Sequence, residues 1–355
     1  MSHIDPRTKI FYHLDRLTEI QQGRVPPPVN VEIDLTNRCN LGCGFCHFGY
    51  THTRGPLAGR RSKPKNAISG GDVMDYRLAI EIMLDLMQNG VRSITWTGGG
   101  EPTLHPYFDS IIATTDGNLD QGIYTNGTLI DKERAALLKL HMTWVYVSLD
   151  AWDEASYKAI KSTPVFKKAC QGVKNLAAAS GKATIGVGFL ITKDNYKWVA
   201  QMYDLAMGLG ADYVQFRPTV LFDQAAPGKL VEDTQWLSTA WAWLDMFSRR
   251  PNMELDLDRF EMYRNWRGHG YPICWWSAVQ TVITPNGKVW TCVNKREHPN
   301  DCLGDLTKQS FADIWAARNL AMVNKDCRVL CRGHLANTAL NAFMYTPSES
   351  HSNFI

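Results

Sequence analysis

The stretch VNVEIDLTNRCNLGCGFC occupies residues 29–46 and joins a strand-like run to three closely spaced cysteines. Val29 to Leu35 is short and largely apolar, which predicts a strand. Cys39, Cys43 and Cys46 follow in a glycine-containing loop just past its end. Three thiolates within eight residues can converge on one inorganic centre, and iron–sulfur clusters are held by cysteine thiolates. A zinc site completed by His47 or by a distant cysteine is the alternative for this spacing.

Strand-like runs and amphipathic helical patterns alternate after this stretch. The alternation predicts parallel β-α-β units with right-handed crossovers. Six units do not complete an eight-fold barrel, so an open partial barrel and a doubly wound sheet both fit. The further strands are expected at Val91–Trp96, Gly122–Thr125, Trp144–Leu149, Thr184–Ile191 and Tyr213–Phe216, and helices around Ala79–Met87, over Asp131–His141 and from about Tyr196 to Leu209.

Composition excludes several classes of protein. The 355 residues are 45% hydrophobic and 21% charged, which excludes disorder, collagen and coiled coil as overall descriptions. With 38 basic and 35 acidic residues, nucleic-acid binding would need a local basic patch. No apolar run suits a membrane span or a signal peptide, so we expect a cytoplasmic protein without membrane contact. Nine cysteines in such a chain indicate metal or redox chemistry and not a disulfide framework.

A second group of cysteines lies near the end of the chain. Gln280–Thr284 and Lys288–Cys292 flank Pro285-Asn286-Gly287, which is typical of a hairpin. The pattern Cys274-x12-Gly287-x4-Cys292 brackets this hairpin, and Cys327-x3-Cys331 adds two more thiols after a short helix. Four thiolates fit a fully ligated [4Fe–4S] cluster and a structural zinc site equally well. Cys170 is expected to fill core space, and the tail from Asn337 to dock loosely.

Beyond the first cysteines, three short segments at the ends of predicted strands add to the pattern: residues 98–102, 125–127 and 148–150. Gly98-Gly99-Gly100-Glu101-Pro102 ends the second predicted strand, where its glycines would let backbone amides approach a ligand and Glu101 would face an amine. With Phe45 before the last cysteine, Cys39-x3-Cys43-x2-Cys46 resembles the radical S-adenosylmethionine (SAM) signature, and Gly99-Gly100-Glu101 resembles that family's motif for the methionine amino group. The resemblance implies cofactor contacts for Phe45, Gly99, Gly100, Glu101, Asn126, Ser148 and Asp150, with Arg217 reaching a carboxylate or a phosphate.

The C-terminal cysteines resemble the extension called SPASM or, when shortened, twitch. Leu303-Gly304-Asp305 and the helix through Ile314-Trp315 belong to this likeness. Five cysteines after residue 270 are too few for the full pattern, so it implies one auxiliary [4Fe–4S] cluster held by Cys274, Cys292, Cys327 and Cys331. Cys302 is the rival ligand, and we expect an unligated thiol there.

The resemblance implies an α/β fold, a partial (β/α)6 TIM-like barrel with a small C-terminal α+β twitch-type cluster domain. The expected parts are an N-terminal helix with a proline-rich lead-in (1–28), the radical SAM barrel (29–230), a helical connector (231–270), the auxiliary cluster domain (271–335) and a tail (336–355).

The implied activity is reductive cleavage of SAM to a 5′-deoxyadenosyl radical, which abstracts hydrogen from a substrate, with oxidoreductase, epimerase or mutase outcomes. Only about 28 residues precede the first strand, too few for a leader-recognition domain, which favours a small sugar-, nucleoside- or nucleotide-like substrate. An electron donor such as flavodoxin or ferredoxin is the implied partner. Radical modification of a base in DNA or RNA, modification of a ribosomally made peptide, and a non-enzymatic zinc-stabilised binding protein are the alternatives.

Residues 51–66 hold five basic side chains and no acidic one, among glycines and prolines. Such a composition cannot bury much apolar surface, so it predicts a loop. A solvated insertion is one interpretation. The other is a cover for the cavity mouth that attracts a phosphate-bearing small molecule or a nucleic-acid backbone through residues 54–65.

Overall fold

The computed structural model describes residues 6–43, 45–46, 73–115, 117–219, 235–248, 250–264, 268–296, 300–318 and 331–345. A single ten-stranded sheet runs through it in the order β10-β9-β8-β1-β2-β3-β4-β5-β6-β7. The six central strands are parallel and follow one another in chain order. They are β1 (Asn30–Asp34), β2 (Ser93–Thr97), β3 (Asp120–Thr125), β4 (Trp144–Ser148), β5 (Thr184–Ile191) and β6 (Tyr213–Pro218).

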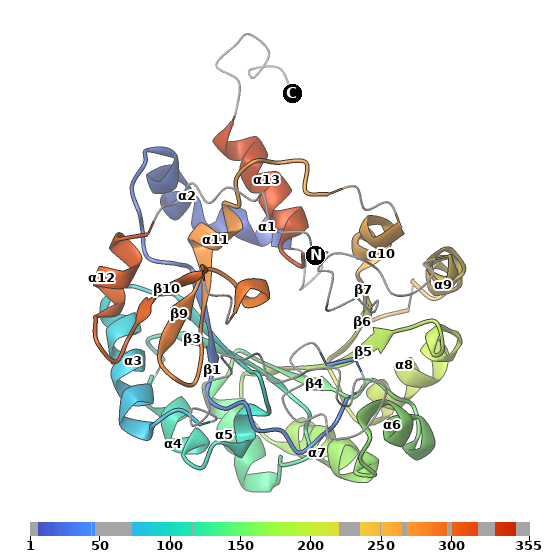
Figure 1. Cartoon of the computed structure of the whole chain (residues 1–355). Coiled ribbons are helices and arrows are strands. Elements are labelled where there is room, and N and C mark those ends of the chain that lie inside the picture. The colour runs from blue at the N-terminus through green and yellow to red at the C-terminus, as the bar shows by residue number, and fades with distance from the viewer. Residues whose placement is uncertain are drawn as a thin grey trace.

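Helices cover the outer face of this curved sheet, and its inner face lines the centre of the molecule (Figure 1). The two faces differ because side chains alternate along each strand. On β1, Val31 and Ile33 pack into the main apolar core, whereas Asn30 and Glu32 bond to inward-facing polar groups. The partial barrel is therefore confirmed. The covering helices are α3 (Tyr76–Gln88), α4 (Phe108–Ala113), α5 (Lys132–His141), α6 (Glu154–Lys161), α7 (Phe166–Ala178) and α8 (Val199–Gly208).

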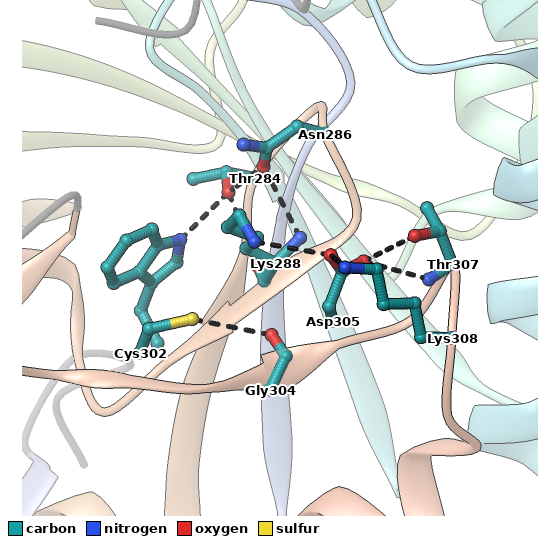
Figure 2. A network of polar contacts seen from close by, with 9 residues as sticks. Thr284, Asn286, Lys288, Cys302, Gly304, Asp305, Thr307 and Lys308 are labelled. Carbon is teal, nitrogen blue, oxygen red and sulfur yellow. Dashed lines mark hydrogen bonds and ion pairs between the residues drawn. The ribbon is translucent and has the colours of Figure 1, made fainter. Parts of the chain in front are cut away.

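The predicted hairpin is confirmed as β8 (Gln280–Ile283) and β9 (Lys288–Trp290). Asn286 shapes the turn, since its side-chain oxygen accepts hydrogen bonds from the Thr284 hydroxyl and the Lys288 amide. β10 (Cys302–Asp305) pairs with β9, and Figure 2 shows Asp305 held by Lys288 and Thr307. β8 also pairs in parallel with β1, so the hairpin extends the barrel sheet. α11 (Trp276–Val279) precedes the hairpin and α12 (Phe311–Ala316) follows β10.

The stretch expected to be a helical connector also contains a strand. After α9 (Trp236–Asp245), β7 (Met253–Leu255) pairs in parallel with β6, and α10 (Leu257–Arg264) follows. The strand has three half-buried residues within a charged stretch, so no apolar run announces it.

The expectation of a loosely docked tail is wrong for the described residues, because α13 (His334–Met344) packs firmly. Leu340 joins a second apolar cluster with Ile10, Leu17, Ile20 and Val279. This cluster holds α13 against α11 and the N-terminal helices α1 (Pro6–Lys9), η1 (Ile10–His13) and α2 (Leu14–Gln21). No helix in the described ranges is long and apolar enough to cross a membrane.

Candidate active site

The first three cysteines lie on a loop that leaves the carboxyl end of β1 and is bonded to its neighbours through the backbone. The Gly100 amide donates to the Thr36 carbonyl (3.0 Å), and the Glu101 amide donates to the Arg38 carbonyl (2.8 Å). A side chain at Gly100 would place its Cβ 1.9 Å from the Arg38 oxygen, so only glycine fits there. Gly100 therefore positions the cysteine loop.

Glu101 is buried and joins the ends of β2 and β3. One carboxylate oxygen accepts from the Thr103 amide and from the Thr103 and Thr125 hydroxyls, and the other accepts from the Asn126 amide at 2.7 Å. Burial raises the pKa of this carboxyl, and these hydrogen bonds oppose the shift. Four donors at one carboxylate indicate a structural role, and the expected contact with an amine stays a prediction.

Asn126, just after the end of β3, is hydrogen-bonded to the cysteine loop. Its amide group donates to the Asn40 side-chain oxygen at 2.7 Å, and Asn40 in turn donates to the Thr128 hydroxyl at 2.8 Å. Asn126 thus lies next to the cysteine loop, as expected of a residue at this motif position. Its contact with a cofactor is untested.

Ser148 and Asp150, at the end of β4, meet a lysine that we did not single out from the sequence. The Ser148 hydroxyl donates to the Asp150 carboxylate at 2.7 Å, and Lys161 forms a fully buried ion pair with the same carboxylate. The Lys161 ammonium also lies 5.2 Å from the centre of the Phe45 ring. Burial alone lowers the pKa of Lys161, but Asp150 and Cys43 outweigh it and raise the pKa, so the lysine stays charged beside the cysteine loop.

Two thiols of the loop are partly shielded from water, which disfavours their charged forms. Burial raises the pKa of Cys39 to about 12 and that of Cys43 to about 11, with Lys161 opposing the second shift. Cys46 lies within electrostatic range of both. Across the described part of the chain, no three His, Cys, Asp or Glu side chains close around a point that could hold a metal ion. The loop thus places the three thiols near one another without closing them around one point, and their soft donor set fits an iron–sulfur cluster.

A cavity of about 570 Å³ occupies the inside of the barrel. It extends from Thr143 and Thr184, where β4 and β5 begin, to Arg217 near the end of β6. Tyr124 and Tyr146 line its wall. Its volume falls in the range of small-molecule sites, about 300–1,000 Å³.

The helix α13 lies beside two of the cysteines expected to hold the auxiliary cluster, Cys274 and Cys331. Asn337 accepts from the Trp276 amide (2.8 Å) and donates to the Ile273 carbonyl (3.2 Å), so its helix holds the segment that carries Cys274. Cys331 lies just before α13 and lines the cavity. Cys292 lies two residues after the end of β9 and immediately before η4 (Val293–Lys295).

Asn337 was missed because a polar residue in an expected tail carries no packing signal. Cys327 and the basic residues 54–65 lie outside the described residues. Cys302 begins β10 and is exposed, with its thiol directed at the Gly304 carbonyl (Figure 2).

A buried ion pair connects the two cysteine-bearing regions. Arg296, four residues after Cys292, binds both oxygens of Asp34 at 2.8 and 3.1 Å. Asp34 ends β1, five residues before Cys39. Both side chains are almost fully inaccessible to water. This pair was not identified from the sequence, because no local pattern links residues 262 positions apart.

Two family models match the chain at these two regions. The radical SAM superfamily model matches residues 33–206, and SPASM, described as an iron-sulfur cluster-binding domain, matches residues 274–333. The chain belongs to the radical SAM superfamily. It carries a C-terminal SPASM/twitch-type domain, and its cofactors are SAM, a SAM-binding [4Fe–4S] cluster and an auxiliary iron–sulfur cluster.

Curated relatives and solved structures agree with this assignment. A "Probable GTP 3',8-cyclase" of Halobacterium salinarum is 27% identical over 192 residues, 53% of this chain and 50% of that protein. A "Tungsten-containing aldehyde ferredoxin oxidoreductase cofactor-modifying protein" of Pyrococcus furiosus is 29% identical over 188 residues, 51% of this chain and 48% of the relative. The chain thus spans about half the length of the curated relatives it matches.

Streptococcus suis SuiB bound to S-adenosylmethionine superposes with a TM-score of 0.62 at 17% identity, over 88% of this chain and 71% of SuiB. The structure of anSMEcpe with bound AdoMet gives a TM-score of 0.59 at 17% identity, over 88% and 85% of the two chains. At these identities the likeness establishes the fold.

Proposed function

We propose that this radical SAM enzyme abstracts hydrogen from a small polar substrate of sugar, nucleoside or nucleotide type held inside the barrel. The observation that carries this proposal is the 570 Å³ cavity, because a volume of that size suits one small molecule and not a folded polymer. When bound, SAM and its cluster supply a 5′-deoxyadenosyl radical that removes a hydrogen atom from an unactivated C–H bond.

The wall of the cavity supports a polar, ring-bearing substrate. Tyr124 and Tyr146 offer flat apolar faces for a ring, and Thr95 and Gln215 offer hydrogen-bonding groups. Several curated relatives are named as probable GTP cyclases, which favours the nucleotide class. Dehydrogenation, epimerisation and rearrangement are the outcomes that such a site could serve.

The roles of the cysteines follow from their places in the fold. Cys39, Cys43 and Cys46 hold the SAM-binding cluster in this proposal, and three ligands leave one iron open for SAM. Cys274, Cys292, Cys327 and Cys331 hold the auxiliary cluster, beside the cavity that Cys331 lines. Flavodoxin or ferredoxin supplies the electron, and residues 54–65 attract an anionic substrate.

Anaerobic turnover with dithionite, followed by mass spectrometry for 5′-deoxyadenosine, tests the proposal. The panel contains GTP and other nucleotides, sugar phosphates and aminosugars, with an oligonucleotide and a short peptide as competing classes. We expect a small polar compound to stimulate 5′-deoxyadenosine formation and, when deuterated, to transfer deuterium to it.

The matched control replaces Cys39, Cys43 and Cys46 together with Ala. This variant should form no 5′-deoxyadenosine and keep about four irons per chain, since the auxiliary ligands are untouched. Stimulation by the oligonucleotide or the peptide alone would contradict the substrate class. Protein with almost no iron and two equivalents of zinc would contradict radical chemistry altogether.

A further inference from the structure

Arg217 is a charged side chain of the cavity whose hydrogen bonding is incomplete. Three other cations that line the cavity are paired with carboxylates: Arg7 with Asp258 at 2.8 Å, Arg259 with Asp256 at 3.1 Å, and Arg332 with Glu32. Among the described residues, Arg217 forms no ion pair, and its buried Nε has no hydrogen-bond partner. A buried guanidinium is ordinarily paired with acceptors or with an anion, and Arg217 lines the cavity from which one could approach it.

The surroundings of Arg217 hold the guanidinium in place without neutralising it. Its Nη2 donates to the Tyr146 hydroxyl at 2.8 Å, and its central carbon lies 4.9 Å from the Tyr146 ring centre and 5.8 Å from that of Tyr124. Aromatic faces attract a cation but supply no hydrogen-bond acceptor. The guanidinium is therefore oriented with donor capacity to spare.

Tyr146, which orients Arg217, fills the space left by the missing side chain of Gly188 on β5. A Cβ at Gly188 on β5 would lie 1.8 Å from the Tyr146 hydroxyl, so the glycine is what admits this side chain. Burial raises the pKa of Tyr146 to about 12, which keeps the hydroxyl protonated at neutral pH. Tyr146 accepts from Arg217, so its own proton is free to be donated to a third group.

We propose that Arg217 and Tyr146 form an oxyanion-binding subsite that holds a phosphate or carboxylate of the substrate, and not the carboxylate of SAM. The subsite lies where the cavity approaches the carboxyl ends of the strands, the edge at which the cysteine loop begins. An anion bound there would fix one end of the substrate near the radical-forming centre and leave its remainder in the 570 Å³ cavity. The substrate class deepens the function proposed above and rests on it.

Binding of simple anions tests this subsite without any need for turnover. Isothermal titration of the iron-loaded protein uses inorganic pyrophosphate and, separately, succinate, so that the two sources of the oxyanion are distinguished. We expect Arg217→Gln to weaken binding of at least one probe about tenfold or more, because charge-assisted hydrogen bonds are lost. The affinity of Arg217→Lys for that probe should lie between those of Arg217→Gln and the wild type, because lysine keeps the charge but lacks the forked donors of a guanidinium. Tyr146→Phe, which keeps the ring, should weaken the same probe by a smaller factor.

Arg250→Gln is the matched control, because Arg250 also lies over two aromatic rings, those of Tyr203 and Phe247, but outside the cavity. It should bind both probes as the wild type does. Equal affinity of wild type and Arg217→Gln for both probes, or no binding of either probe to the wild type, would overturn the proposal.

SAM cleavage without substrate separates this inference from the proposed function. Arg217→Gln should still cleave SAM without substrate, which the Cys39, Cys43 and Cys46 triple variant does not, and should keep the wild-type iron content. Loss of that cleavage with iron intact would assign Arg217 to SAM and overturn the subsite. Normal anion binding together with no 5′-deoxyadenosine from any panel compound would instead leave the subsite standing and count against the proposed substrate class.

Discussion

Cys302 and Cys170 are two thiols outside both proposed cluster sites, and their surroundings differ. Cys302 is exposed at the start of β10, whereas Cys170 packs against the core from α7. Burial raises the pKa of Cys170 to about 11, with Lys174 opposing the shift. A raised thiol pKa keeps the group neutral at pH 8, and only the thiolate is a good nucleophile.

In the iron-loaded protein at pH 8, iodoacetamide should therefore modify Cys302 first and Cys170 much more slowly. The rate at Cys170 should rise about tenfold per pH unit until pH approaches about 11. Mass spectrometry of peptides from timed samples measures both rates. Cys302→Ser is the control and should keep its full iron content. Loss of about half the iron in this variant would make Cys302 a ligand and contradict its assignment as a free thiol.

The motif residues show how far a sequence pattern predicts contacts. Gly100, Glu101 and Asn126 lie beside the cysteine loop, because they follow strands whose carboxyl ends share one edge with β1, and their predicted contact with a cofactor stays a prediction. The pattern gave the region but not the contacts. The sequence pattern did not predict that Glu101 accepts from four donors. It also did not predict that the Arg38 carbonyl leaves no room for a side chain at Gly100. Such contacts depend on the path of a loop, which periodicity does not encode. Lys161 was missed for a similar reason, since a lysine at a helix end ordinarily lies in solvent.

At the scale of secondary-structure elements, the Asp34–Arg296 pair joins the end of β1 to η4. Replacing Arg296 with Met should lower the free energy of unfolding by about 3–5 kcal/mol, because the Asp34 carboxylate would stay buried without its partner. Urea denaturation of the iron-loaded protein under anaerobic conditions measures this change.

Arg250→Met provides the comparison, because the Arg250–Asp204 pair is largely exposed. Its loss should change the stability by about 0–1 kcal/mol. Equal stability of Arg296→Met and Arg250→Met would show that the buried pair does not hold the two elements together.

The elements that the sequence predicted well are those with strong local signals. β1 to β6 are apolar runs between amphipathic helices, and the β8–β9 turn carries Pro285-Asn286-Gly287. β7 and α13 lack such signals. β7 is short and half-buried, and α13 buries the polar side chains Asn337 and Asn341, which bond to the Ile273 carbonyl. Elements whose stability comes from distant partners cannot be recognised from their own residues.

At the scale of the whole molecule, the C-terminal segment continues the barrel sheet. β8 pairs with β1, although Gln280 and Asn30 are 250 residues apart in sequence. The sequence predicted a small antiparallel unit but not its attachment, since the side-chain pattern of a strand does not name its neighbour. The two cysteine-bearing regions therefore share one sheet, and the Asp34–Arg296 pair links them where β1 ends.

The helix α13 is bonded to the segment that carries Cys274, and this contact leads to a prediction about the auxiliary cluster. Asn337 bonds to both the Trp276 amide and the Ile273 carbonyl, on either side of Cys274. Replacing Asn337 with Ala removes its bond to the Trp276 amide and leaves the Ile273 carbonyl bonded to Asn341, at a cost of about 1–3 kcal/mol. The segments that carry Cys274 and Cys331 should then separate more readily. We expect the Asn337→Ala protein to lose about half of its iron to a chelator faster than the wild type, because only one of two clusters is affected.

Thr338→Ala is the control for this prediction. Thr338 is the next residue of α13 and is exposed, and within the described ranges its side chain bonds only to the His334 carbonyl of its own helix. Iron release is followed by absorbance during a timed incubation with an iron chelator, and SAM cleavage without substrate reports separately on the first cluster. That cleavage should survive in Asn337→Ala, because α13 packs, within the described residues, against the Cys274 segment and the N-terminal helices. Equal release of iron from Asn337→Ala and Thr338→Ala would mean that α13 does not secure the auxiliary site.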